Sequence, residues 1–554
     1  MSKYVIGIDF GTLSGRAVLM DATTGKEIAE ATKEYAHAVM DTALPSGKKL
    51  PPSYALQHPA DYIDVLQSTV REVVKESGVS VSDIVGFGVD FTSCTLIPLD
   101  KNMQPLCFRE EYEDDPHAYV KLWKHHGAQP EADEINALAA ARDEKWLHYF
   151  GGRLSSEWVL PKILEILHDA PEIFDETYRF LEAGEWITYL LCGNEVHNPN
   201  LAGFKNLWTK EFGFPKDDFF AALDSRLSGI MGTKLGDKVG KMSDVAGRIT
   251  EQGAELTGLS VGTAVSTPII DAHSAIPALN MIHDGDMTMT IGTSSGYLLN
   301  TKENISVDGI CATVGDGVVD GLYVHEAGQS AVGDIFAWFT SNCVPESYEN
   351  EAREKGISIH KLLREKAKSL RPGESGLIAL DWHNGNRSVL DNGDLSGLIL
   401  GLTLQTRPEE IYRALIESVA FGTKVIFDRF EECGAKIKNV CAAGGIAQKD
   451  EMMMQIYADV LNRPIRIAGT KQASARGAAL MATVAAGCYS DLIEACDALA
   501  LPDYCVYYPN ESNREIYESL FKEYKTLHDY FGTGVNRVME RLTDIKRIRT
   551  DLRF

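Results

Sequence analysis

Residues 4–20 read YVIGIDFGTLSGRAVLM, and residues 287–299 read MTMTIGTSSGYLL. Each has an apolar run of strand length, a turn of small residues and a second apolar run, which is the pattern of a β-hairpin. Gly and Ser are common in any tight turn, so a single such hairpin would carry little information. Two matched copies far apart in the chain predict a duplicated fold with a shared cleft. Their alignment pairs Gly11-Thr12 with Gly292-Thr293 and Ser14-Gly15 with Ser295-Gly296.

The stretches around the hairpins alternate between strand and helix patterns. A buried-strand pattern at 84–90 and a helical one at 156–168 follow the first hairpin. Amphipathic helices near 328–340 and 408–432 follow the second, and a strand at 438–443 then runs through a Gly-Gly pair into a helix that reaches residue 460. This alternation predicts an α/β fold in both halves.

We place the domain boundary in the turn at 283–286, which gives an N-terminal domain at 1–285 and a C-terminal domain at 286–510. From about residue 512 the pattern is wholly helical, so 511–554 is predicted to be a helical C-terminal extension. Residues 534–554 carry six basic and three acidic side chains. Such a segment can bind a partner, but a solvated helix face or an oligomer contact is the commoner explanation. We expect a homo-oligomer, a dimer.

The composition is that of an ordinary globular protein, with 44% hydrophobic and 24% charged residues among 554. Seventy-nine acidic residues against 54 basic ones give a formal charge of -25, which repels nucleic acids and anionic membrane surfaces. Neither is therefore expected as a partner. An anionic substrate must be held by local devices such as backbone N–H groups and a few placed Lys or Arg side chains.

Several features favour a cytoplasmic protein. The ten cysteines show no zinc-like or disulfide-dense spacing, as expected in a reducing compartment. The N-terminus runs directly into a strand pattern rather than a signal peptide. The uncharged stretch 477–490 has 14 residues, fewer than the ~20 that span a bilayer.

The hairpin turns suit a phosphate group, because Gly, Thr and Ser expose backbone N–H groups and hydroxyls without bulky side chains. Neither a G-x-x-x-x-G-K-[ST] loop nor a G-x-G-x-x-G fingerprint occurs, so a nucleotide site must have another design. Two turns could grip one polyphosphate from opposite sides. A third Gly-rich turn, at 444–449, could lie against a flat ligand or a phosphate.

The two hairpins differ at one informative position, where the first has Asp9 and the second has Thr290. A carboxylate beside a polyphosphate needs a cation between them, and Mg²⁺ binds through one or two carboxylates plus phosphates and waters. The alternative to a metal-binding role is that Asp9 only caps the turn, an interpretation that the matching second hairpin disfavours.

Asp271 is a second acidic candidate, since it follows the apolar run at 267–270 and precedes a helical pattern. A carboxylate at the carboxyl end of a strand faces the crevice where open α/β sheets bind ligands, and it could act as a general base towards a hydroxyl. Position alone favours a helix N-cap. His273 could be a metal ligand, but without a spaced companion a core His is the commoner case.

These residues together resemble the FGGY carbohydrate kinases over nearly the whole chain. The phosphate motifs of that family resemble 9–16 and 290–295, its adenosine motif resembles 443–449, and its C-terminal signature resembles 397–417. Six further stretches resemble the branch of the family that acts on L-ribulose: 90–92, 121–126, 155–158, 203–208, 326–331 and 381–387.

The resemblance implies two actin-like, ribonuclease-H-like domains that close on a cleft, and an ATP- and Mg²⁺-dependent transfer to the 5-hydroxyl of L-ribulose in L-arabinose catabolism. It makes Asp271 the base that takes the proton from the sugar, and places Asp9 and Asp271 near Mg²⁺. It assigns the ketose to Ser93, Lys205, Asp271 and Glu326. It assigns ATP to the phosphate and adenosine motifs: Gly11, Thr12, Ser14, Arg16, Gly292, Thr293, Ser294, Gly444, Gly445 and Gln448. Taken alone, Lys205 would pass for a surface residue and Glu326 for a helix-start carboxylate.

The chain departs from the family pattern at three places, which bear on the choice of sugar. Ser93 stands where the branch has Ala, Leu13 replaces a polar residue in the first phosphate turn, and 273–281 is poor in Gly. One alternative is another kinase of the family, acting on D-ribulose, ribitol or xylulose. A chaperone-like or filament-forming ATPase would share the fold, and a sugar sensor would be expected to lack Asp9 or Asp271.

Overall fold

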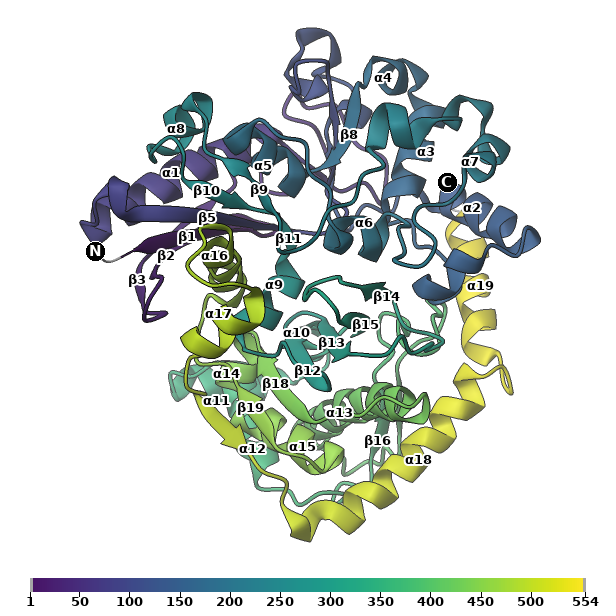
Figure 1. Ribbon diagram of the computed structural model, residues 1–554. Coiled ribbons are helices and arrows are strands. Elements are labelled where there is room, and N and C mark those ends of the chain that lie inside the picture. The colour runs from purple at the N-terminus through teal and green to yellow at the C-terminus, as the bar shows by residue number, and fades with distance from the viewer. Residues whose placement is uncertain (1–2, 552–554) are drawn as a thin grey trace.

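The computed structural model describes residues 3–551 and shows two α/β domains, one above the other in Figure 1, with helices α18 and α19 along one side. Residues 1–2 and 552–554 lie outside the described residues, and with them Arg553 of the basic segment. Each domain is built on a seven-stranded sheet with its own hydrophobic core.

The first sheet begins with the first predicted hairpin. β1 (Tyr4–Phe10) pairs antiparallel with β2 (Ser14–Asp21) and parallel with β5 (Ile84–Phe91). Six of the seven residues of β1 are buried, as expected for a strand covered on both faces. The strand order is β3-β2-β1-β5-β10-β9, and β11 also pairs with β5. The remaining strands are β3 (Glu27–Glu34), β9 (Val245–Arg248), β10 (Ala264–Ser266) and β11 (Ile269–Ile270).

The second sheet repeats this arrangement. β12 (Asp286–Ile291) pairs antiparallel with β13 (Ser295–Thr301) and parallel with β18 (Asn439–Ala443). The predicted duplication is therefore confirmed at the level of strand pairing. The order is β14-β15-β13-β12-β18-β19-β20, which adds β14 (Ala312–Gly315), β15 (Tyr323–Gln329), β19 (Ile465–Ile467) and β20 (Cys505–Tyr507).

Smaller elements complete each domain. The first has α1 (Pro59–Ser77) on its main sheet. It also carries a four-stranded sheet with its helices: β4 (Leu56–Gln57), β6 (Leu96–Leu99), β7 (Val120–Lys121), β8 (Arg179–Glu182), α2 (Gln129–Ala141), α3 (Val159–Asp169) and α5 (Ala183–Cys192). In the second, α13 (Pro408–Glu432) has the predicted bounds and packs against β16 (Ile378–Leu380).

Helix α16 (Ala473–Ala485) comes from the second half of the chain but packs on the first sheet and on α9 (Asp271–Ala278), as Figure 1 shows. The approach is so close that a Cβ on Gly88 of β5 would lie 1.9 Å from the backbone oxygen of Ala478. A Cβ on Gly477 would lie 1.8 Å from the backbone oxygen of Ser274 in α9. The halves are thus interlocked, and the domain boundaries given above stay predictions.

Two helix predictions were wrong in part. The helix expected at 328–340 starts only at Gly333 (α10, Gly333–Asn342), because β15 continues to Gln329. The helix expected after 444 is divided at Asp450 into α14 (Gly445–Lys449) and α15 (Glu451–Leu461). The side chain of Asp450 accepts a hydrogen bond from the Met453 N–H and so caps the second helix.

The predicted helical extension is present as α18 (Arg514–Gly532) and α19 (Val538–Asp551). Tyr524 of α18 is fully buried and donates a hydrogen bond to Asp381 over 2.6 Å. Two apolar side chains of α19 are exposed, with Leu542 58% and Ile545 56% accessible. In residues 3–551, no helix combines the length and the apolar character that crossing a membrane requires.

Candidate active site

Each hairpin turn is closed by a backbone hydrogen bond from its glycine N–H, but the two bonds span different numbers of residues. In the first, the Gly11 N–H donates to the Ser14 carbonyl over 3.0 Å, and in the second, the Gly292 N–H donates to the Ser294 carbonyl over 2.9 Å. Two side chains hold the first turn through Thr12: Gln57 donates to its carbonyl over 2.7 Å and Trp123 to its hydroxyl over 3.1 Å. The first turn is therefore fixed before a ligand arrives.

The second turn is held by backbone groups instead. The Val332 N–H donates to the Thr293 carbonyl over 2.8 Å, and the Gly333 N–H donates to the Gly292 carbonyl over 3.0 Å. These donors lie at the start of α10, so the turn is attached to a helix N-terminus. The turn thus sits beside the positive end of a helix, where a phosphate is favoured.

Asp9 lies near the end of β1, 4% exposed, and its Oδ2 is 2.9 Å from Nη1 of Arg16 on β2. Burial raises the pKa of Asp9, although the Arg16 charge opposes this. Thr290 has the matching place in β12, and its buried hydroxyl lacks a hydrogen-bond partner among the described residues. The difference between the hairpins seen in the sequence is therefore a difference of charge at one end of the cleft.

Asp90 is a further carboxylate of this site to which the sequence assigned no role. It pairs in register with Asp9 across the parallel strands β1 and β5 and is fully buried. Burial and then the Asp9 charge raise the pKa of Asp90 well above its ordinary value. Its position after a buried-strand pattern was a usable signal, but the register that places it beside Asp9 was not available from the sequence.

Asp271 is the first residue of α9, and the N-cap position belongs to Ile270, so the N-cap interpretation was wrong. Its Oδ1 accepts a hydrogen bond from the Ala272 N–H over 2.7 Å. Burial and then the charge of Asp9 raise the pKa of Asp271 to about 7. A carboxyl group with that pKa is suited to accept a proton at neutral pH.

Lys205 and Glu326 meet where the two domains are in contact. Lys205 ends α6 (Pro199–Lys205), and its Nζ lies 3.6 Å from Oε1 of Glu326 in β15. The same Nζ donates to the Ser93 hydroxyl over 3.2 Å. Glu326 is thus a strand residue and not a helix-start carboxylate, and the structure brings the three residues together.

The ion pair sets the charge states of Lys205 and Glu326. Burial alone would lower the pKa of Lys205, but the charge of Glu326 together with those of other acidic groups nearby outweighs it, and the pKa is raised. Burial would likewise raise the pKa of Glu326, but the Lys205 charge lowers it. Both groups are therefore charged at neutral pH. Oε2 of Glu326 is buried and has no hydrogen-bond partner in the described part of the chain, so it can accept one from a ligand.

A second charged pair crosses the cleft nearby. Nη2 of Arg387 lies 3.8 Å from Oε1 of Glu157, which is also 3.7 Å from Nε2 of His126. All three residues stand in stretches that the sequence singled out without assigning them a role. Their proximity could not be read from the sequence, because Glu157 and Arg387 belong to different domains.

The third Gly-rich turn lies against the second hairpin. Gly444 has φ +101°, and a Cβ there would lie 2.4 Å from the Ile291 carbonyl oxygen, so only glycine fits. Gly445 begins α14, and Gln448 in that helix donates to the Thr470 carbonyl over 2.8 Å. The turn thus adjoins the end of β12, directly before Gly292.

Comparison with known proteins agrees with this geometry. Residues 4–276 match the N-terminal domain and residues 287–486 the C-terminal domain of the FGGY family of carbohydrate kinases. The ribulokinase of Halalkalibacterium halodurans is 47% identical over 99% of this chain and 98% of its own length, and that of Shouchella clausii is 48% identical over the same shares. A xylulose kinase structure from Rhodospirillum rubrum, 23% identical, superposes with a TM-score of 0.79 over 95% of this chain and 98% of its own. The two matched domains together span most of the chain, which therefore belongs to the FGGY family of carbohydrate kinases.

Proposed function

We propose that this kinase transfers the γ-phosphoryl group of ATP to the 5-hydroxyl of L-ribulose and so supplies L-ribulose 5-phosphate in L-arabinose catabolism. Relatives at 47–48% identity over nearly the full chain are ribulokinases, which favours this sugar within the family. The observation that carries the proposal is the pair of Lys205 and Glu326 across the cleft, with Oε2 of Glu326 left without a partner among the described residues.

These residues would recognise the ketose by its hydroxyl groups. Oε2 of Glu326 would accept a hydrogen bond from one hydroxyl, and the Lys205 ammonium would donate to another. The Ser93 hydroxyl, 3.2 Å from Lys205, adds a group that can donate or accept. A stereoisomer that misplaces one hydroxyl would leave a buried charged group unsatisfied, which costs roughly 1–3 kcal/mol or more.

Asp271 would act as the general base. With a pKa of about 7, about half of it is ionised at neutral pH, and the ionised form can take the proton of the sugar hydroxyl as the new P–O bond forms. Phosphoryl transfer needs little covalent chemistry from the protein, so the remaining residues position the reactants and stabilise charge.

The two turns would bind the phosphates through Gly11, Thr12, Ser14, Gly292, Thr293 and Ser294, with Arg16 beside them. The adenosine would lie against Gly444, Gly445 and Gln448, which adjoin the second turn. Backbone N–H groups in tight turns are suited to polyphosphates in a protein of this negative charge.

Carbohydrate kinases of this family use ATP and a divalent metal ion, and we propose Mg²⁺. Asp9 raises the pKa of Asp271, which indicates two carboxylates close enough to share a cation. No group of three or more His, Cys, Asp or Glu side chains in the described residues could hold a metal alone. Mg²⁺ characteristically uses one or two carboxylates and completes its shell with phosphates and waters, so Asp9 and Asp271 fit. When bound, the ion would neutralise charge on the phosphates.

The proposal is tested by measuring ADP release from ATP and Mg²⁺ with a panel of L-ribulose, D-ribulose, xylulose, ribitol and glycerol. L-Ribulose should give the highest kcat/KM, with its epimers lower because one hydroxyl no longer matches Lys205 or Glu326. A higher kcat/KM for D-ribulose or xylulose would overturn the choice of sugar. ADP release that no sugar stimulates would favour an ATPase of the same fold instead.

A further inference from the structure

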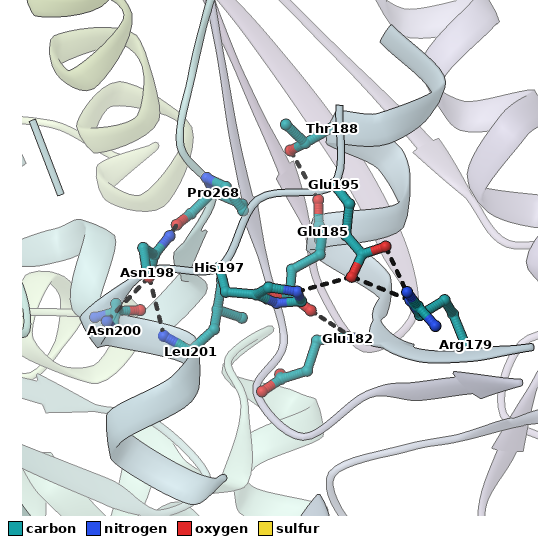
Figure 2. A network of polar contacts seen from close by, with 11 residues as sticks. Arg179, Glu182, Glu185, Thr188, Glu195, His197, Asn198, Asn200, Leu201 and Pro268 are labelled. Carbon is teal, nitrogen blue, oxygen red and sulfur yellow. Dashed lines mark hydrogen bonds and ion pairs between the residues drawn. The ribbon is translucent and has the colours of Figure 1, made fainter. Parts of the chain in front are cut away.

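Asn200, the second residue of α6, is fully buried and uses both ends of its side-chain amide. Figure 2 shows it beside Asn198 and Leu201. Its Oδ1 accepts a hydrogen bond from the Ile270 N–H over 2.8 Å. Its Nδ2 lies 3.0 Å from Nδ1 of His273 and donates to the Gly317 carbonyl over 2.6 Å. One side chain therefore contacts the strand before Asp271, the helix after it and the second domain.

The contact with His273 determines which ring nitrogen carries the proton. An amide nitrogen can only donate, so Nδ1 of His273 must accept, and the proton must be on Nε2. That Nε2 lies 3.9 Å from Oε2 of Glu326, the oxygen that lacks a hydrogen-bond partner in residues 3–551. The ring of His273 is buried and lies 4.1 Å from that of Phe204, measured between centroids. The N–H group of His273 therefore lies near Oε2 of the carboxylate, whereas Lys205 lies near Oε1.

The same part of α6 is tied to the strand that leads to Asp271. Asn198 caps α6 by accepting from the N–H groups of Asn200 and Leu201, and its Nδ2 donates to the Pro268 carbonyl over 2.7 Å. Figure 2 shows these contacts beside His197, which is 2.8 Å from Glu185 and 3.1 Å from Glu195. Since Lys205 ends this helix, its place relative to Asp271 depends on the same contacts.

The bond to Gly317 joins the two domains next to the ketose site. Gly317 lies between β14 and β15, and a Cβ on it would lie 2.9 Å from the ring of Phe204 in α6. α6 and the loop after β14 therefore pack without space between them. The Asn200 amide can make all three contacts only when the domains are in this arrangement.

We propose that Asn200 is a positioning residue. It holds His273 as the Nε2–H tautomer beside Glu326 and so orients the carboxylate that receives the ketose. It also ties α6 to the segment that carries Asp271 and to the second domain. The part that concerns the ketose rests on the proposed function. The part that concerns the tautomer does not.

The tautomer is tested on the unliganded wild-type protein by ¹⁵N NMR with labelled histidine. His273 is assigned by the loss of its signals in His273→Gln. We expect its ring nitrogens to show the neutral Nε2–H tautomer at neutral pH. A proton on Nδ1, or a mixture of the two tautomers, would overturn the proposal whatever sugar the enzyme uses.

The positioning role is tested with Asn200→Asp, using the best substrate of the panel. The carboxylate keeps an acceptor for the Ile270 N–H but loses the donor to His273 and repels the Gly317 carbonyl. We expect kcat/KM for the ketose to fall about tenfold or more, with the KM for ATP unchanged within about twofold.

Asn300→Asp is the matched control, because Asn300 is also fully buried and donates to the Met281 carbonyl over 2.7 Å, away from the cleft. It should lower Tm while leaving the KM for the ketose unchanged. Equal effects of the two variants on ketose kinetics, or a folded Asn200→Asp enzyme with normal kinetics, would overturn the proposal. If Asn200→Asp does not fold, the tautomer measurement on the wild type decides it.

Discussion

The pKa of Asp271 is raised by its partial burial and then by the charge of Asp9, whereas the hydrogen bond from the Ala272 N–H at the start of α9 lowers it. Lys205 and Arg16 oppose this effect but do not cancel it. The same carboxyl group would be a poor proton acceptor on an exposed surface, where its pKa would be about 3.9. The local environment therefore favours general-base chemistry close to neutral pH.

We predict that kcat/KM for the ketose falls at acid pH, because the base is active only when Asp271 is ionised, and that bound Mg²⁺ moves this fall below the pKa of about 7 that Asp271 has without metal. At higher pH the rate should reach a plateau. Asp271→Asn keeps the shape but cannot take the proton, so turnover should fall by about 10²–10⁴ and the acidic limb of the profile should vanish.

Initial rates from pH 5.5 to 9 at saturating ATP and Mg²⁺ measure both effects. Asp286→Asn is the control, since Asp286 is a buried aspartate at the opposite end of β12 from the phosphate turn. Its pH profile should match that of the wild type. Near-normal turnover of Asp271→Asn would contradict the assignment of the base.

The sequence could predict that a residue belongs to the site where a single strand or turn places it there. The comparison of the two hairpins marked Asp9, whereas Asp271 was marked by its place at the end of an apolar run together with the family resemblance. Asp90 and Asn200 depend on contacts between segments far apart in the chain, namely the register of β1 with β5 and the packing of α6 on α9. The local sequence pattern does not show which distant segments come into contact, and a single Asn belongs to no motif that would mark it.

At the scale of elements, the hairpins were predictable because alternating apolar residues and small turn residues both act locally. The position of Glu326 was not, because the helix expected near 328–340 made it a helix-start carboxylate. Pairing of β15 with β13 makes Glu326 a strand residue opposite Leu298 instead. Long-range pairing of this kind overrides local preference.

The close packing of α16 leads to a prediction about Gly477. Alanine is the better helix former, yet its Cβ would overlap the backbone of α9, so Gly477→Ala should lower the free energy of unfolding by about 1–3 kcal/mol. Activity should fall as well, because α9 carries Asp271. Gly232→Ala, where no atom lies within 4 Å of the added Cβ, should change stability by about 0.5 kcal/mol or less.

Urea unfolding of both variants measures the difference, with turnover measured on the folded protein. A Gly477→Ala variant as stable as the Gly232→Ala control would contradict the close contact of the two helices. Full stability with reduced turnover would instead mean that α9 had shifted to make room for the new methyl group.

At the scale of the whole molecule, the net charge of -25 is offset locally in the cleft. Arg16 lies beside Asp9 at the first turn, Lys205 beside Glu326, and Arg387 beside Glu157. Composition predicted that an anionic ligand would need such local groups. It could not predict that two of the three pair with glutamates of the opposite domain and so join the halves of the molecule.

The cross-cleft pairs predict that domain closure is coupled to ligand binding. Closure would exclude water that could otherwise attack ATP, and a ketose bound between Lys205 and Glu326 would hold the domains together. Small-angle X-ray scattering should therefore give a smaller radius of gyration with the ketose and a nonhydrolysable ATP analogue than without them. Arg387→Gln removes the pair with Glu157 and should increase the radius of the free protein, whereas Arg371→Gln, at a side chain 86% exposed, should not. An equal radius with and without both ligands would mean that the site is preformed and that the pairs act only within a closed structure.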